Sequence, residues 1–142
     1  MNSISRCVLL ALALVAAACS DQNTTTPLPR PDTPPSKLLT FNGTLQPGGN
    51  DSYPFAVTQS GDLQVTLISA VDATSSNALT VGLGIGSISS GGACLLTYSV
   101  NATGGTRAQV TGTAQIGSMC VSIFDVGNLT GPANYTVTVA AP

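Results

Sequence analysis

Apolar and polar residues alternate with a period of two along most of the chain after residue 36. In one of the clearest segments Leu63, Val65 and Leu67 share one face, and polar residues lie between them. Because successive side chains of a strand point to opposite faces, this spacing predicts strands with one buried face in antiparallel sheets. We expect such strands in segments 39–45, 53–57, 63–67, 79–85, 119–124 and 134–139, and two less regular ones near 94–100 and 106–111.

Short clusters of Gly, Asn, Asp, Ser and Pro separate these strands. Residues 47–51 divide the first two strands, and residues 59–62 divide the next two closely enough to predict a hairpin. No segment after the N-terminal region has helical periodicity, and Thr and Val, which suit half-buried pleated surfaces, are abundant. Seven or eight short strands predict an all-β domain, a small antiparallel β-sandwich, with a small closed barrel as the alternative.

The first residues have the pattern of an export signal. Arg6 supplies a positive charge, and an apolar run over residues 7–18 ends in small residues directly before Cys19. A run of about a dozen residues is too short to span a bilayer and has the length of a signal-peptide core. Residues 16–19, Ala-Ala-Ala-Cys, resemble the lipobox of bacterial lipoproteins, with Ala at the usual Leu position. The resemblance implies cleavage before Cys19, a diacylglyceryl group on its thiol and often an acyl chain such as palmitate on its new amine.

Residues 20–36 are polar and contain five prolines, so they cannot bury apolar surface and favour extended conformations. This composition suits the tether of a lipid-anchored domain, whereas an ordinary signal peptide with an incidental cysteine, the alternative, needs none. We therefore expect a lipoprotein signal peptide over residues 1–18, a lipidated cysteine and Pro-rich linker over 19–36, and a β-sandwich domain over 37–142. Ser20, rather than Asp, follows the cysteine. By resemblance to lipoproteins of double-membraned bacteria, this implies the outer membrane of the cell envelope, on its periplasmic or surface face.

Three segments of the domain carry a second resemblance. They read FNGTL at 41–45, NDSYPFAV at 50–57 and GDLQVTL at 61–67. Together with the patterns at 117–124 and 134–139, they resemble bacterial pre-peptidase C-terminal domains, while residues 72–115 match no motif of that family. The resemblance implies a compact jelly-roll-like β-sandwich that accompanies secreted peptidases or binds extracellular polymers.

Cys94 and Cys120 are the two cysteines of the domain. In an exported protein, an even pair of this kind predicts a disulfide. A nucleophilic or metal-binding thiol is the alternative, but the chain has no His to activate the thiol or to share a metal with it. The same absence argues against Ser-His-Asp sites and His-bearing zinc sites. We expect no cofactor.

The domain has few candidates for a ligand site. Asn50, Asp51 and Asp62 lie in successive turns that a sandwich could bring to one end, which makes them calcium candidates. No sequential calcium loop is present, and an aspartate in a turn usually bonds to its own backbone. Tyr98 is the aromatic residue expected at a ligand-contacting surface, because the other two tyrosines fall on apolar strand faces.

Charge argues against one class of partner. Lys37 and Arg107 are the basic residues of the domain, too few to neutralise phosphates, so nucleic-acid binding is not expected. The expected function is that of a non-enzymatic, lipid-anchored envelope module that binds an extracellular polymer or a protein. One alternative is a structural or assembly role, as an accessory subunit of an envelope complex. Another is a small hydrolase that uses aspartates, since paired carboxylates can hydrolyse glycosides.

Overall fold

The computed structural model describes residues 37–142. The expected signal peptide, the lipidated Cys19 and the Pro-rich linker lie outside the described residues. Within that range no helix is long and apolar enough to cross a membrane. The described residues form eight strands: β1 (Lys37–Leu45), β2 (Asn50–Val57), β3 (Gly61–Asp72), β4 (Thr80–Ile88), β5 (Cys94–Thr103), β6 (Val110–Ala114), β7 (Gly117–Phe124) and β8 (Ala133–Ala141).

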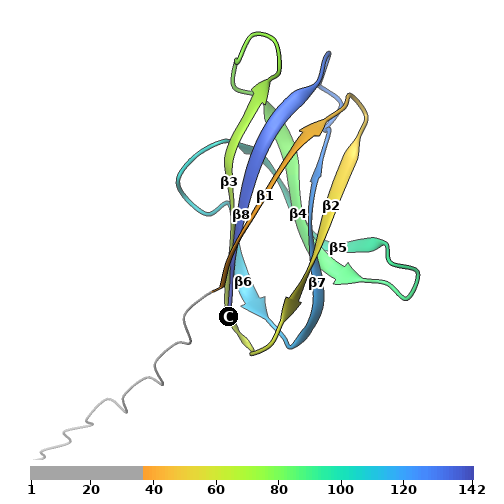
Figure 1. Cartoon of the computed structure of the whole chain (residues 1–142), viewed down its shortest axis with the longest axis vertical. Helices are drawn as coiled ribbons and strands as arrows, with labels where there is room; N and C mark the ends of the chain where they lie inside the picture. Colours follow the sequence, from red (N-terminus) through yellow and green to blue (C-terminus); the bar gives the residue numbers. More distant parts are fainter. Residues whose placement is uncertain (1–36) are drawn as a thin grey trace, which may run out of the picture. The chain divides into compact units, whose positions relative to one another are not determined.

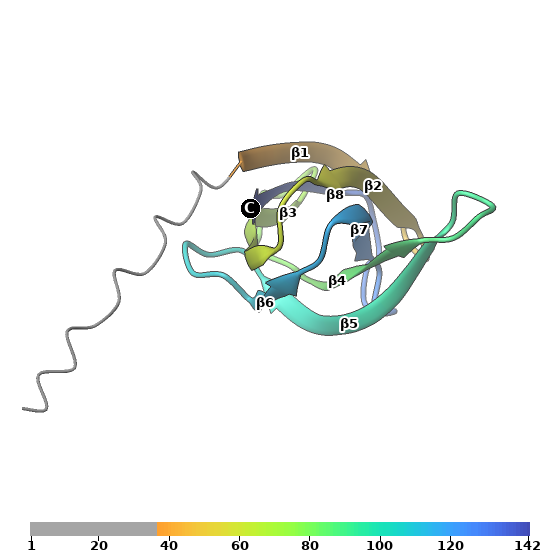
Figure 2. The same cartoon turned by 90° about the horizontal axis from the view of Figure 1, so that it is seen from below.

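The strands form two four-stranded antiparallel sheets that enclose the core (Figures 1 and 2). Sheet A has the order β1-β8-β3-β6, and sheet B has the order β2-β7-β4-β5. Because β1 pairs with β8, β2 with β7, β3 with β6 and β4 with β5, the two halves of the chain run antiparallel as one long ribbon. A ribbon folded over two sheets in this way is a jelly roll. The expected all-β sandwich is therefore confirmed.

The core consists of the inward members of the alternating segments. In sheet A, Val137 of β8 pairs with Leu67 of β3, and in sheet B, Ile123 of β7 pairs with Leu83 of β4. All four side chains are fully buried. Burying an apolar side chain of this size contributes roughly 1.5–3 kcal/mol, so the sequence alternation directly drives the two sheets together.

The hairpin expected at residues 59–62 is wrong. Strand β2 belongs to sheet B and β3 to sheet A, so residues 58–60 carry the chain from one sheet to the other. Both strands present apolar residues on one face, and Phe55 and Leu63 are buried in the same core. Because the two strands lie in opposite sheets, the apolar face of each strand is buried in the core between them. A connection of three residues is long enough for this crossing as well as for a hairpin.

The strand expected at 106–111 begins later than the alternation suggested, at Val110. The preceding loop is held against β3 by two backbone hydrogen bonds. The amide of Gly105 donates to the carbonyl of Leu67, and the amide of Gln109 donates to the carbonyl of Val65. These bonds occupy the edge of β3 that a longer β6 would have used.

Strands β4 and β7 are buried on both faces. The alternation of apolar and polar residues predicted that only one face of each would be buried. The outward positions of β4 are glycines, and neighbouring chain segments cover them. The side chain of Leu96 lies over Gly84, and the start of β5 passes so close to Gly86 that a Cβ there would collide with the main chain of Leu95. The close approach of β5 therefore requires glycine at this position.

The disulfide between Cys94 and Cys120 closes over the same strand. Cys120 of β7 lies opposite Gly86 of β4, and Cys94 opens β5 on the far side of β4. With β5 folded over Gly86, the two cysteine Cα atoms lie 5.8 Å apart and the bridge joins β5 to β7 across β4. The disulfide expected from the sequence is confirmed.

Tyrosine hydroxyls tie the two sheets together at their β1–β2 edge. Tyr135 of sheet A donates a 2.8 Å hydrogen bond to the carboxylate of Asp51 in sheet B. The hydroxyl of Tyr53 lies 2.6 Å from that of Tyr135 and extends the chain of bonds. A Cβ at Gly43 would collide with the Tyr135 hydroxyl, so glycine leaves the room that the pair needs. Tyr135 is part of the core, and the partly buried Tyr53 packs against it, on the apolar faces that the sequence predicted.

The sandwich has two ends, which the strand directions define. We call the end at which β1 begins the basal end; it holds Lys37, Pro142 and the connections 58–60 and 115–116, and the 89–93 connection projects sideways from β4 and β5 near this end (Figure 1). The opposite end, which we call apical, holds the connections 46–49, 73–79 and 125–132.

We predict that replacing both Cys94 and Cys120 by Ser lowers the free energy of unfolding by about 3–4 kcal/mol. The bridge joins residues 26 positions apart, and a loop of this length restricts the unfolded chain by about that much. Urea denaturation of the double variant and the unreduced protein measures the difference. Two cysteines that alkylate freely in the unreduced, unfolded chain would show that no bridge forms.

We predict that Tyr135 makes the fold sensitive to alkali. Burial, together with the hydrogen bonds to Tyr53 and Asp51, raises the pKa of Tyr135 far above its usual 10.0. The phenol stays protonated in the folded chain while the unfolded chain loses that proton, so stability is present below pH 10.0 and falls as the pH rises further. Tyr135→Phe should show a shallower fall in denaturation experiments. The exposed Tyr98→Phe is the control and should behave like wild type; equal slopes for all three proteins would contradict the prediction.

Candidate functional site

The outer side of sheet A is lined by threonine and amide side chains. They occupy the outward positions of four strands, between the buried Val, Leu and Tyr side chains of the core. We call this surface the threonine face; it comprises Thr40, Asn42, Thr44, Gln64, Thr66, Thr111, Thr113, Asn134, Thr136 and Thr138. A surface of this composition presents many hydroxyl and amide groups with almost no charge.

Cross-strand pairing arranges these side chains in rows. Thr138 of β8 lies opposite both Thr40 of β1 and Thr66 of β3. In the next row, the hydroxyl of Thr136 donates a 2.8 Å hydrogen bond to the side-chain oxygen of Asn42. Bonds between cross-strand neighbours fix the orientation of polar side chains on a sheet. The amide N–H groups of Asn42 remain unused by that bond.

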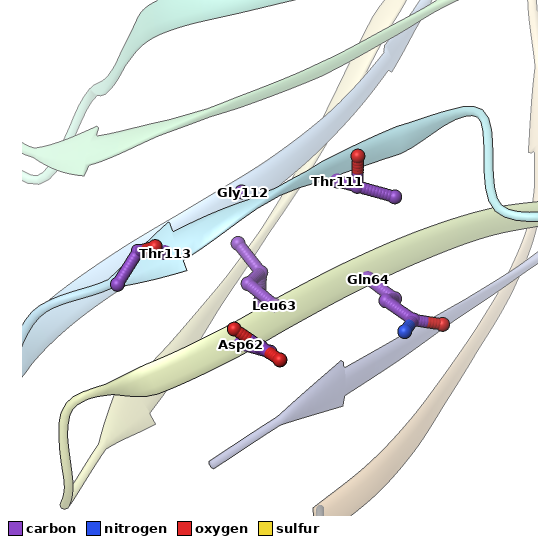
Figure 3. A pocket seen from close by; sticks show the side chains of 6 residues that line it. All are labelled: Asp62, Leu63, Gln64, Thr111, Gly112 and Thr113. Carbon is purple, nitrogen blue, oxygen red and sulfur yellow. The ribbon is translucent and has the colours of Figure 1, made fainter. Parts of the chain in front are cut away.

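The threonine face is hollowed between β3 and β6 (Figure 3). Asp62 pairs with Thr113, and Gln64 pairs with Thr111. These four side chains help to line a hollow of about 320 Å³. Figure 3 shows Asp62 and Gln64 on one side of β3, opposite the buried side chain of Leu63. One carboxylate, one amide and two hydroxyls therefore surround the hollow.

Two further aspartates accept hydrogen bonds from turn amides at the apical end. The amides of Gly48 and Gly127 donate to Asp125, and the bond from Gly48 is the main reason that its pKa is lowered. Amides of the following turn, first that of Ser75, likewise lower the pKa of Asp72. This is the turn chemistry that the sequence suggested for aspartates.

The calcium candidates are not brought together. Asn50 and Asp51 open β2 at the apical end, whereas Asp62 lies at the start of β3, at the basal end. The expectation that one end of the sandwich collects all three is wrong, because β2 runs the length of the domain between them. Asp51 instead accepts the bond from Tyr135. Among residues 37–142, no three His, Cys, Asp or Glu side chains gather closely enough to hold a metal.

Tyr98, the expected aromatic contact, is 54% exposed. It lies on β5, at the edge of sheet B, and so it is not part of the threonine face. Leu95 and Leu96 of the same strand are also exposed. Sheet A therefore has a mainly polar outer surface, on which Leu38 and Ile68 are also exposed, and sheet B has a partly apolar edge.

The sequence contained a signal for the threonine face that single-strand reasoning missed. Segments 64–66, 111–113 and 136–138 each place polar residues at outward positions. Alternation assigns those residues to an outer face, but it does not tell which strands are neighbours. Only the pairing of β3 with both β6 and β8 assembles the outward residues into one surface.

Comparison with known proteins supports the fold. No family model matches the chain, and no curated protein matches it, so the resemblance to pre-peptidase C-terminal domains stays a prediction. Among solved structures, the crystal structure of Yersinia pseudotuberculosis-derived mitogen (YPM) is similar, with a TM-score of 0.51 and 17% sequence identity. The match covers 75% of this chain and 87% of that chain. At this level of identity, the similarity shows a common small β-sandwich fold and nothing about activity.

Proposed function

We propose that this chain is a lipid-anchored, non-catalytic module of the bacterial cell envelope that binds a hydroxyl-rich polymer through its threonine face. The observation that carries the proposal is the uncharged array of hydroxyls and amides on sheet A, hollowed beside Asp62 and Gln64. A neutral polysaccharide presents the same groups, so many hydrogen bonds can form without a charged partner.

The arrangement of the array favours such a ligand. Side chains of one sheet face are held by the backbone at fixed spacings, about 4.8 Å between strands, so their order does not have to be created on binding. The hollow between β3 and β6 adds one carboxylate, Asp62, which can accept hydrogen bonds from two sugar hydroxyls. A rigid polar face with one acidic hollow therefore suits a polymer with repeating hydroxyls.

The distribution of acid and base groups supports binding without catalysis. The chain has no His and no Glu, so proton transfer near neutral pH would fall to groups whose usual pKa values lie about three units away. Asp72 and Asp125 bond to turns, and Asp51 bonds to Tyr135. Glycoside hydrolysis that survives repurification and is lost in Asp62→Asn would favour the small-hydrolase alternative.

An assembly role is the second candidate, and β5 supports it. This edge strand carries no charged residue and no proline along its ten positions, although edge strands commonly use such residues against pairing with other chains. Leu95, Leu96 and Tyr98 are exposed on it. A stoichiometric protein partner that is lost in Tyr98→Lys and retained in Gln64→Ala would favour an accessory subunit over a polymer-binding module.

We predict that Gln64→Ala combined with Thr111→Ala weakens polymer binding roughly tenfold. Each lost hydrogen bond costs about 0.5–1.5 kcal/mol, and the two side chains face each other across the hollow. Co-sedimentation with peptidoglycan sacculi and with neutral insoluble polysaccharides measures the binding.

The matched control for this experiment is Ser99→Ala combined with Asn101→Ala, since both residues are exposed on β5 of sheet B. It should bind like wild type. If the Gln64→Ala/Thr111→Ala variant still bound the polymer and the β5 control did not, the ligand would lie on sheet B and the proposal would be wrong.

We predict that the mature chain begins at a lipidated Cys19. Two or more acyl chains hold a protein firmly on a membrane, whereas one does so only marginally. Intact mass spectrometry of protein from the detergent phase should give the mass of residues 19–142 plus acyl groups, and Cys19→Ser should abolish the modification. An unmodified Cys19, or membrane retention of the Ser variant, would refute the anchor.

A further inference from the structure

Exposed apolar side chains gather at the basal end of the sandwich. Of the seven large apolar side chains exposed in residues 37–142, three lie at or near this end: Leu38, Leu95 and Ile116. Leu38 and Ile116 are the most exposed, at 67% and 69%. Val126, at 36%, is the one exposed at the apical connections. Single exposed apolar residues are ordinary, whereas several at one end of a domain make a candidate interaction surface.

The basal residues come from separate elements around the rim of that end. Leu38 lies in β1 at one edge of sheet A, Leu95 in β5 at an edge of sheet B, and Ile116 between β6 and β7. Beside Ile116 a hollow of about 260 Å³ opens, with Met119 also in its lining. Apolar side chains that are spread around a rim can all contact a broad, deformable apolar surface, whereas a compact partner could reach only some of them.

Side-chain charge is distributed in the opposite way. Asp51, Asp72 and Asp125 lie at the apical end, while the basal end has Lys37 and Asp62, and Arg107 lies in the connection between β5 and β6. Three of the four aspartate side chains of residues 37–142 are therefore far from the apolar rim. An anionic lipid surface would repel the apical end and accept the basal one.

The covalent chain continues from the same end. Lys37 begins β1 at the basal end, and only 17 residues separate it from Cys19. An anchor at that cysteine would keep the domain near the membrane, so a weak contact would form at high effective concentration. The element that leads to the anchor is the one that carries Leu38.

We propose that the basal rim, with Leu38, Leu95 and Ile116, rests on the lipid surface to which the chain is anchored. This inference depends on the lipid anchor of the proposed function. Contact at the rim orients the domain with its acidic end outward and its threonine face upright beside the membrane, where a polymer can reach it.

Tryptophan reporters test the orientation directly, because the chain contains no Trp of its own. Ile116→Trp and Leu38→Trp place the reporter on the basal rim, and Val126→Trp places a matched one at the apical end. The full lipid-anchored chain is reconstituted into vesicles of phosphatidylethanolamine and phosphatidylglycerol that carry brominated acyl chains, which quench nearby Trp. The basal reporters should be quenched severalfold more than Val126→Trp, and their emission should shift to shorter wavelength. Adding Leu95→Ser to Ile116→Trp should reduce the quenching.

The outcomes separate this inference from the anchor itself. If the variants float with the vesicles and the basal and apical reporters are quenched equally, the anchor stands and the oriented contact is wrong. If none of the variants floats with the vesicles, the anchor is wrong and the oriented contact falls with it.

Discussion

Burial of two apolar strand faces against each other is the constraint on which the rest of the domain depends. Six of the seven connections between successive strands cross from one sheet to the other, and only β4 and β5 are successive neighbours within a sheet. Each crossing lets a strand turn its apolar face toward the same core, as Val137 and Ile123 do from opposite layers. The hydrogen bond from Tyr135 to Asp51 and the disulfide between Cys94 and Cys120 then stabilise an arrangement that apolar burial has already selected.

The same alternation that fills the core also creates the proposed binding face. Every inward Val or Leu of β3 and β8 has an outward Thr, Gln or Asn beside it, and β-branched threonine suits both a strand and a hydrated surface. Charge is nearly absent from that face, and Asp62 stands at the rim of its hollow. Fold stability and ligand recognition thus use alternate residues of the same strands, so variants of the outward residues can test binding without disturbing the core.

Sequence reasoning reached the individual strands and the disulfide but not the relations between strands. Period two located β3 and β8 because one of their faces is open to solvent. It misjudged β4, whose outward glycines are covered by β5, and the turn at 58–60, because alternation is the same for a hairpin and for a crossing between sheets. The calcium candidates failed for a different reason: Asn50 opens β2 and Asp62 comes after its far end, so the length of β2 separates them. The hollow depends on pairing between β3 and β6, whose paired residues are about fifty positions apart.

An NMR titration of the domain with soluble glycan fragments of envelope polysaccharides tests the central claim most directly, since it locates a ligand residue by residue. The account predicts that the first and largest amide shift changes occur at residues 62–64 and 111–113, on both sides of the hollow, with smaller changes along β8. Changes confined to β5 or to the apical connections, or no change with any glycan, would contradict the claim that the threonine face binds a hydroxyl-rich polymer.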